Sequence, residues 1–190
     1  MPRKPSYDRD DLIERARDIF WRRGWAGTSL KDLEKTLDLR PGSFYAAFGS
    51  KDALYELAMD KYANDGVIRL KELADTLGPL EALKSHPKLV IHNTENAAKA
   101  CMLAKTFVEL HIHRHPLAAR ANEHLAKMQS LISDLFTQAQ AAGEIRSQHD
   151  PAQLGRRYQS DLLGLRVSAE RDDIDAAAIA DEISSGLDKL

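Results

Sequence analysis

The most reactive side chains of the sequence are a single cysteine and a run of histidines in the middle of the chain. Cys101 is the only cysteine among 190 residues, so it has no partner for an internal disulfide. Its thiol could sense oxidants or electrophiles if the nearby Lys99 and Lys105 favoured the thiolate. A free cysteine is also a common small buried apolar residue, and the sequence leaves both interpretations open.

The histidine run, HIHRH, occupies residues 111–115. On a helix His111 and His115 would share one face, at the spacing of some metal sites. A third ligand is not evident, Pro116 would end the helix at once, and histidines near a helix carboxyl end also suit its dipole. We therefore predict no metal and no cofactor. Because no nucleophile–base pair appears elsewhere, we also predict that the protein is not an enzyme.

Residues 28–55 indicate a different chemistry, contact with nucleic acid. Leu30, Leu33 and Leu37 recur at helical spacing and predict a short helix. Residues 38–42 interrupt it with proline and glycine, which mark a turn. A second short helix should follow this turn.

Phe44 and Phe48, four residues apart, would anchor the inner face of that second helix and leave small side chains outside. Two short helices joined by a tight turn form a helix-turn-helix, whose second helix fits the major groove of B-DNA. Arg40, at the start of this helix, is the predicted base contact because its fork matches guanine O6 and N7. Four further residues would press against thymine methyls or the DNA backbone: Pro41, Gly42, Ser43 and Ala46. A solvated helix face is the alternative.

Residues 10–57 resemble the amino-terminal domain of the tetracycline-repressor (TetR) family of bacterial regulators. The resemblance lies in Gly24-Trp25 ahead of Thr28-Ser29, and in the run GSFYAAFGSK at residues 42–51. The family pattern is a hydrophobic residue, tyrosine, two variable residues, phenylalanine and a lysine three further on. It is matched here by Phe44, Tyr45, Phe48 and Lys51. The variable pair, often an aromatic or polar residue and histidine, is Ala46-Ala47 here.

The resemblance implies a repressor that binds a palindromic double-stranded DNA operator as a homodimer and is released by a small-molecule effector. Phosphate contacts are implied for Thr28, Ser29, Tyr45 and Lys51. The effector pocket should lie among the central helices, with candidate lining residues Tyr62, Cys101, Met102, Thr106, Phe107, His111, Met128 and Tyr158. The alternatives are a redox- or electrophile-responsive regulator acting through Cys101, and an all-α enzyme or interaction module that borrowed the DNA-binding unit.

Helical periodicity dominates the whole chain and no β pattern appears, which predicts an all-α fold of about nine helices. Residues 1–50 should form the three-helix DNA-binding domain, and residues 51–190 the effector-binding and dimerisation bundle. Helices are expected over residues 8–23, 50–77, 97–115, 117–142 and 175–187 and from residue 150, with 80–93 broken by His86-Pro87 into short or kinked pieces. The last two helices should pair with a second copy, where Gly155 and Gly164 would allow close approach.

Composition sets wider limits. A net charge of −2 does not by itself indicate a nucleic-acid partner. A hydrophobic content of 43% is enough for a hydrophobic core. We find no run of about eighteen apolar residues and no apolar segment behind the basic start, so we expect no membrane span, no secretory signal and a cytoplasmic protein. The arm at residues 1–7 either follows the DNA minor groove or is an untethered tail.

Overall fold

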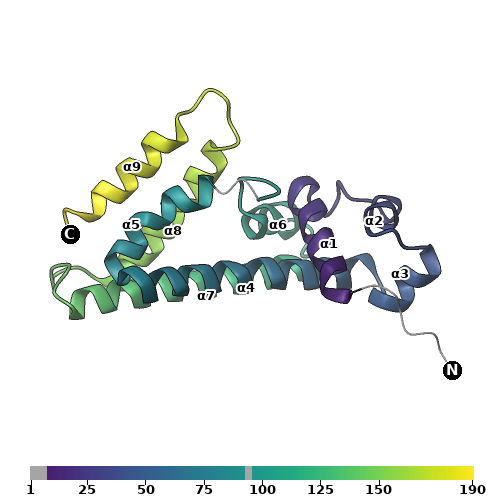
Figure 1. Ribbon diagram of the computed structural model, residues 1–190, viewed down its shortest axis with the longest axis horizontal. Helices are drawn as coiled ribbons and strands as arrows, with labels where there is room; N and C mark the ends of the chain where they lie inside the picture. The colour runs from purple at the N-terminus through teal and green to yellow at the C-terminus, as the bar shows by residue number, and fades with distance from the viewer. Residues whose placement is uncertain (1–7, 93–95) are drawn as a thin grey trace.

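The computed structural model of the protein describes residues 8–92 and 96–190, so the predicted amino-terminal arm lies outside the described residues. Within these ranges the chain forms nine α-helices and no strand, which confirms the all-α prediction (Figure 1). The helices are α1 (Arg9–Arg23), α2 (Leu30–Leu37), α3 (Pro41–Phe48), α4 (Lys51–Leu77), α5 (Pro79–His92), α6 (Met102–His111), α7 (Pro116–Ala141), α8 (Pro151–Ser168) and α9 (Ala176–Leu187).

The α2–α3 pair forms as a helix-turn-helix because local signals fix both ends of the turn. Ser29 begins α2 with a capping box: its Oγ accepts from the Asp32 amide at 3.1 Å, and the Asp32 carboxylate accepts from the Ser29 amide at 3.0 Å. Asp38 ends α2 in the left-handed region at φ 54°. Pro41 then opens α3, where its missing N–H leaves no partner unsatisfied.

A first apolar core holds these helices against α1 and the beginning of α4. Phe44 and Phe48 are 0% and 6% exposed and lie 5.9 Å apart between ring centroids, as their spacing predicts. The same core extends beyond residue 50 to Ala63, and it includes Cys101 and the inward residues of α6. The boundary between residues 50 and 51 therefore stays a prediction, because apolar packing runs across it.

Two long helices, α4 and α7, run side by side along the length of the molecule (Figure 1). At 27 residues, α4 is about 40 Å long at 1.5 Å per residue. Asp60 of α4 ties it to α7, because it accepts hydrogen bonds from Arg120 Nε at 3.0 Å and contacts His124 Nε2 at 2.6 Å. Burial alone would raise the pKa of Asp60, but these hydrogen bonds and charges outweigh it and leave that pKa below its usual value.

Two predicted elements differ from the structure. The segment 80–93 is not broken at Pro87, because α5 is one helix from Pro79 to His92 with Pro87 buried inside it. Packing of α5 against α4, α7, α8 and α9 compensates for the one hydrogen bond that proline removes. The predicted central helix over 97–115 is also wrong at both ends, since α6 covers only Met102–His111.

The end of α6 changes the interpretation of the histidine run. Arg114 has φ 50°, so the chain turns after His111 and the histidines at 111 and 115 do not share one helix face. His115 instead begins α7, where its side chain accepts from the Leu117 amide at 3.3 Å. Among residues 8–92 and 96–190 there is no group of three His, Cys, Asp or Glu that could hold a metal ion.

Helix α9 lies at the end of the molecule away from α1–α3, and α8 runs from that end toward α6 (Figure 1). Gly155, predicted to allow close approach at a dimer interface, is used within the chain, because a Cβ there would lie 2.1 Å from Ser133 Oγ of α7. Gly164 faces open space instead, since a Cβ there would meet no described atom within 4 Å. Across the described chain, no helix combines the length and apolar character needed to cross a bilayer.

Phe44→Ala should destabilise the protein by about 3–5 kcal/mol, because it removes a fully buried ring from the first core. Tyr45→Ala is the matched control, since Tyr45 is 50% exposed and should change the free energy of unfolding far less. Urea unfolding followed by circular dichroism measures both. Equal losses for the two variants would contradict the assignment of inner and outer faces to α3.

Candidate nucleic-acid interface and ligand cavity

The outer face of α3 is a continuous exposed surface. Phe44 and Phe48 point into the core, and most of the outward side chains around them are short. Six of the residues predicted to contact DNA lie in α3 or immediately before it, and all six are exposed: Arg40, Pro41, Gly42, Ser43, Tyr45 and Ala46. Because only Arg40 and Tyr45 are large, the backbone of α3 can come close to a groove wall.

The three other predicted phosphate contacts lie at helix starts near α3. Thr28 is 0% exposed, and its hydroxyl donates to the Gly24 carbonyl at 2.8 Å, so its prediction as a phosphate contact needs correction. The hydroxyl closes the turn after α1 because it has a nearer acceptor inside the protein. Ser29 remains exposed, although its Oγ donates to Asp32 at 2.6 Å.

Lys51 lies over the indole of Trp25, with 4.1 Å between its ammonium and the ring centroid. Burial lowers the pKa of Lys51. Trp25 is partly buried against the first core, and its Nε1 donates to Asp52 at 2.7 Å. The indole therefore positions the first turn of α4 and its lysine.

Glu109 of α6 clamps the DNA-binding unit to the rest of the protein. Its carboxylate accepts from the amides of Trp25 at 3.1 Å and Ala26 at 2.7 Å. Gly24 makes this approach possible, because its φ is +75° and a Cβ there would lie 2.8 Å from Glu109 Oε2. One turn earlier, Lys105 Nζ donates to the Trp21 carbonyl at 2.7 Å. Helix α6 is thus hydrogen-bonded to the end of α1 at two positions.

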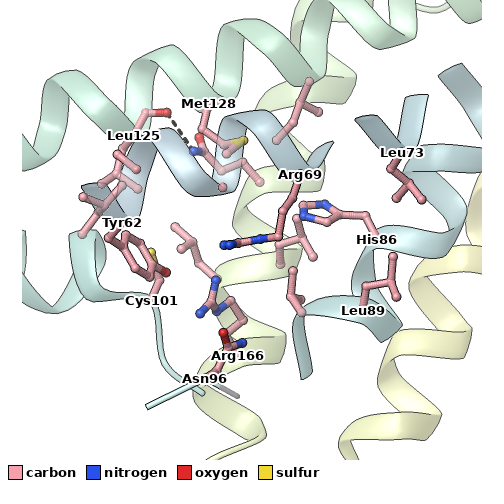
Figure 2. Close-up of a pocket in the computed structure, with 18 of the residues that line it drawn as sticks. Tyr62, Arg69, Leu73, His86, Leu89, Asn96, Cys101, Leu125, Met128 and Arg166 are labelled. Carbon is pink, nitrogen blue, oxygen red and sulfur yellow. Dashed lines mark hydrogen bonds between the residues drawn. The ribbon is translucent and has the colours of Figure 1, made fainter. Parts of the chain in front are cut away.

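A cavity of about 660 Å³ lies beside the other end of α6. Figure 2 shows side chains from α4, α5, α7 and α8 converging on it. Most of its wall is apolar, including Leu73, Leu89, Leu125, Met128, Leu162 and Leu163. A pocket of this size and character suits an organic small molecule.

Three of the predicted effector residues line this cavity: Tyr62, Cys101 and Met128. The other five do not. Met102 and Thr106 are buried in the first core, where Thr106 Oγ1 lies 2.6 Å from the Tyr55 hydroxyl. Phe107 stacks on the exposed ring of His111, 4.7 Å away.

Tyr158, the fifth, is buried in a second apolar core and donates to the Leu83 carbonyl at 2.7 Å. These corrections have one cause: helical spacing identifies the buried face of an element but not the neighbour that covers it.

Helical periodicity did not predict the polar residues of the wall, chiefly Arg69, His86 and Arg166. Arg166 follows Leu162 by four residues and so interrupts the apolar stripe of α8 with a charge. Arg69 precedes Leu73 of α4 by four residues and so lies on the same helical stripe. A cation at a position that periodicity assigns to the core is the signal that could have found both.

Two titratable groups of the cavity wall, His86 and Tyr62, are held in their neutral forms. Burial lowers the pKa of His86 to about 4, and the nearby positive charges of Arg166 and Arg69 add to the effect. His86 is therefore neutral at pH 7. Burial raises the pKa of Tyr62 well above its usual value, so its phenol also stays neutral.

Two family models match this chain: one for bacterial regulatory proteins of the tetR family over residues 12–58, and one for the tetracyclin repressor-like C-terminal domain over residues 79–178. The second match alone covers more than half of the 190 residues. The chain belongs to the TetR family.

Similar proteins agree with this assignment. The HTH-type transcriptional repressor ComR of Escherichia coli (strain K12) is 23% identical to this TetR-family chain over 167 residues, which cover 86% of this chain and 80% of ComR. The TetR-family regulator CifR, solved as a cysteine mutant with 26-base-pair operator DNA, is 26% identical and superposes with a TM-score of 0.80 over 97% of both chains. AibR, solved with isovaleryl coenzyme A and operator DNA, shares the fold at 19% identity, with a TM-score of 0.68 over 94% of this chain and 96% of AibR. The prediction of a TetR-family transcriptional repressor is confirmed at this level.

Glu109→Gln should destabilise the attachment of the DNA-binding unit to α6. The glutamine amide keeps one acceptor oxygen and turns a donor toward the other backbone N–H, which should lower the free energy of unfolding by about 1–3 kcal/mol. Hydrogen exchange at Trp25 and Ala26 should become faster. Glu56→Gln, on an exposed residue of α4, is the control. Unchanged exchange at both amides would show that the clamp contributes nothing.

Proposed function

We propose that this TetR-family regulator binds a palindromic operator as a homodimer and that an organic molecule in the cavity releases it from DNA. The observation that carries the proposal is the exposed outer face of α3, held by two buried phenylalanines. A short helix with this face matches the geometry of a recognition helix in the major groove. The DNA complex of CifR, a protein of the same fold, supports it.

The exposed residues take different roles in this proposal. Arg40 contacts a base, since it is exposed immediately before the first turn of α3 and its fork can pair with guanine. Ser29, Tyr45 and Lys51 contact phosphates and set the position of α3 without reading sequence. Pro41, Gly42, Ser43 and Ala46 let the helix approach the groove closely.

The homodimer would form through α8 and α9. The face of α8 around Gly164 is open, and Val167 on the same helix is 58% exposed. Ile179 and Ile183 of α9 stay only partly buried and line a groove between the two helices. A second copy could bury these residues in a four-helix interface around a two-fold axis, which would space two α3 helices for a palindrome.

Helix α6 would connect the cavity to DNA. It begins beside Cys101 and Leu103, which line the cavity. Lys105 in its first half and Glu109 in its second half bind the end of α1 and the turn that follows it. A ligand that favours one position of α6 changes the position of the DNA-binding unit, and it lowers operator affinity only if that position fits DNA less well. AibR, solved with both a ligand and operator DNA, supports a ligand-responsive regulator.

A second candidate is regulation through oxidation or alkylation of Cys101. The observation that favours it is the position of the thiol on the cavity wall, where a small electrophile could reach it. Against it, Cys101 is only 7% exposed and packs in the first core.

Operator selection from randomised duplexes tests the main proposal. Arg40→Ala should relax discrimination at one base pair of each half-site by about 1–3 kcal/mol, because it removes a bidentate contact. Lys51→Ala should weaken binding to all sequences alike. It should also reduce the salt dependence of operator affinity by the equivalent of about one phosphate contact. The reverse pattern would contradict the assigned roles. A monomeric protein without preference for any duplex at low salt would refute the proposed function.

Cys101→Ser separates the two candidates. If the cavity responds to a reversibly bound ligand, hydrogen peroxide should leave the operator affinity of wild type and Cys101→Ser equal, because the thiol is buried. If Cys101 is the sensor, peroxide should convert its thiol to a sulfenic acid with release of water and should lower only the wild-type affinity. Gel shifts before and after treatment, with mass spectrometry of the thiol, give the answer.

A further inference from the structure

Arg166 of α8 has a hydrogen-bonding group that the protein leaves unused. Its Nε donates to the Lys99 carbonyl at 2.7 Å, which fixes the guanidinium at the edge of the cavity. Its Nη2 is buried and has no hydrogen-bond partner among the described residues. Most buried polar groups are paired, and an unpaired donor on a charged group is costly. A donor of this kind at the wall of a cavity indicates a missing acceptor.

A second guanidinium comes from the opposite side. In Figure 2 the side chain of Arg69, on α4, extends into the cavity toward Arg166 and passes beside His86. Both arginines act on the charge of His86, which places both near its ring. Neither makes an ion pair within 4 Å with a carboxylate of the described residues.

Most carboxylates near the two arginines already have partners. Glu14, Asp18 and Asp65 share a second cavity with Arg69, and all three pair with Arg17. Glu170 is the carboxylate whose charge acts on Arg166, but its Oε1 already accepts from the amides of Lys99 and Ala100 at 2.8 and 2.7 Å. Glu72 also lines the cavity and is exposed on α4. With His86 neutral, the described residues that line the cavity include two arginines and one carboxylate, Glu72.

We propose that the cavity binds an organic anion with an apolar body, whose carboxylate is held by Arg166 and Arg69. The planar fork of arginine binds a carboxylate with two parallel hydrogen bonds, and Nη2 of Arg166 supplies a donor that is otherwise unpaired among the residues described. The apolar body lies among Leu73, Leu89, Leu125 and Met128. This proposal rests on the proposed function in taking the cavity as the effector site, and it adds the chemical class of the effector.

The proposed anion site also lies next to the residues that connect the cavity to α1. The residue bonded to Arg166 Nε is Lys99, and the next carbonyl, of Ala100, accepts from Trp21 Nε1 of α1 at 2.6 Å. The Arg166 guanidinium itself is 5.7 Å from the Trp21 ring. A carboxylate that pulls on Arg166 therefore acts one residue away from the segment that leads into α6.

Three probes of equal chain length test the charge requirement: decanoate, 1-decanol and decylammonium, each below its aggregation concentration. Binding is followed by the fluorescence of Trp21 in a Trp25→Phe background and by calorimetry, without DNA. Decanoate should bind at least about tenfold more tightly than the neutral and cationic probes. Equal affinities for the three, or preference for decylammonium, would overturn the proposal.

Variants locate the anion. Arg166→Gln and Arg69→Gln should each weaken decanoate by about tenfold or more and leave 1-decanol unchanged. Arg156→Gln, an exposed arginine on the same helix, is the matched control and should change neither. If Arg166→Gln does not fold, Arg69→Gln decides, because Arg69 is exposed. Loss of decanoate binding in neither variant, or in Arg156→Gln to the same extent, would overturn the assignment.

Glu95 lies outside the described residues, next to Asn96 of the cavity wall, and is tested directly. A wild type that ignores decanoate but binds it after Glu95→Gln would show that the chain supplies its own anion, which overturns the proposal. Operator binding is measured separately in the same variants. If decanoate does not bind but the operator does, only the proposed anion site is refuted. If no operator binds, the proposed function is refuted, and the decanoate result is unaffected.

Discussion

The backbone of Lys99 and Ala100 is the point on which the rest of the structure depends. The four backbone polar groups of these two residues all bond to side chains distant in the sequence. The carbonyls accept from Arg166 of α8 and Trp21 of α1, and the amides donate to Glu170, which follows α8. Groups bonded in this way are not available for a helical ladder. Helix α6 consequently begins only after Cys101, and two residues of the irregular segment before it, Asn96 and Cys101, line the cavity.

This constraint connects two regions that are far apart in the sequence. Trp21 belongs to the helix that supports the DNA-binding unit, whereas Arg166 and Glu170 lie at the end of α8. A displacement of Lys99 and Ala100, which join these two regions, would also displace α6. Helix α6 is bonded a second time to the end of α1 through Lys105 and Glu109. The interior of the larger domain and the DNA-binding unit are thus joined by a short hydrogen-bonded network, one of the physical routes by which two sites can be coupled.

In the DNA-binding unit, by contrast, interactions between residues close in the sequence determine most of the structure. A capping box at Ser29, a left-handed Asp38 and a proline at the first position of α3 fix the turn within a dozen residues. The outer face of α3 remains small and exposed, while Thr28, which looks like a surface donor in the sequence, is drawn inward by the Gly24 carbonyl. A hydroxyl next to a free carbonyl is buried when the turn closes over it, and only the folded turn shows this.

Local signals in the sequence were enough to predict the helix-turn-helix, the long α4, the starts of α8 and α9 at Asp150 and Asp175, and the inward direction of Phe44 and Phe48. They were not enough for the length of α6, the continuity of α5 through Pro87 or the cavity. Each of these depends on groups distant in the chain, because Arg166 and Trp21 stop the helix before Cys101 and neighbouring helices hold α5 across its proline. Helical spacing says that a side chain is buried, but only the packing of several helices sets whether it meets another side chain or an empty space.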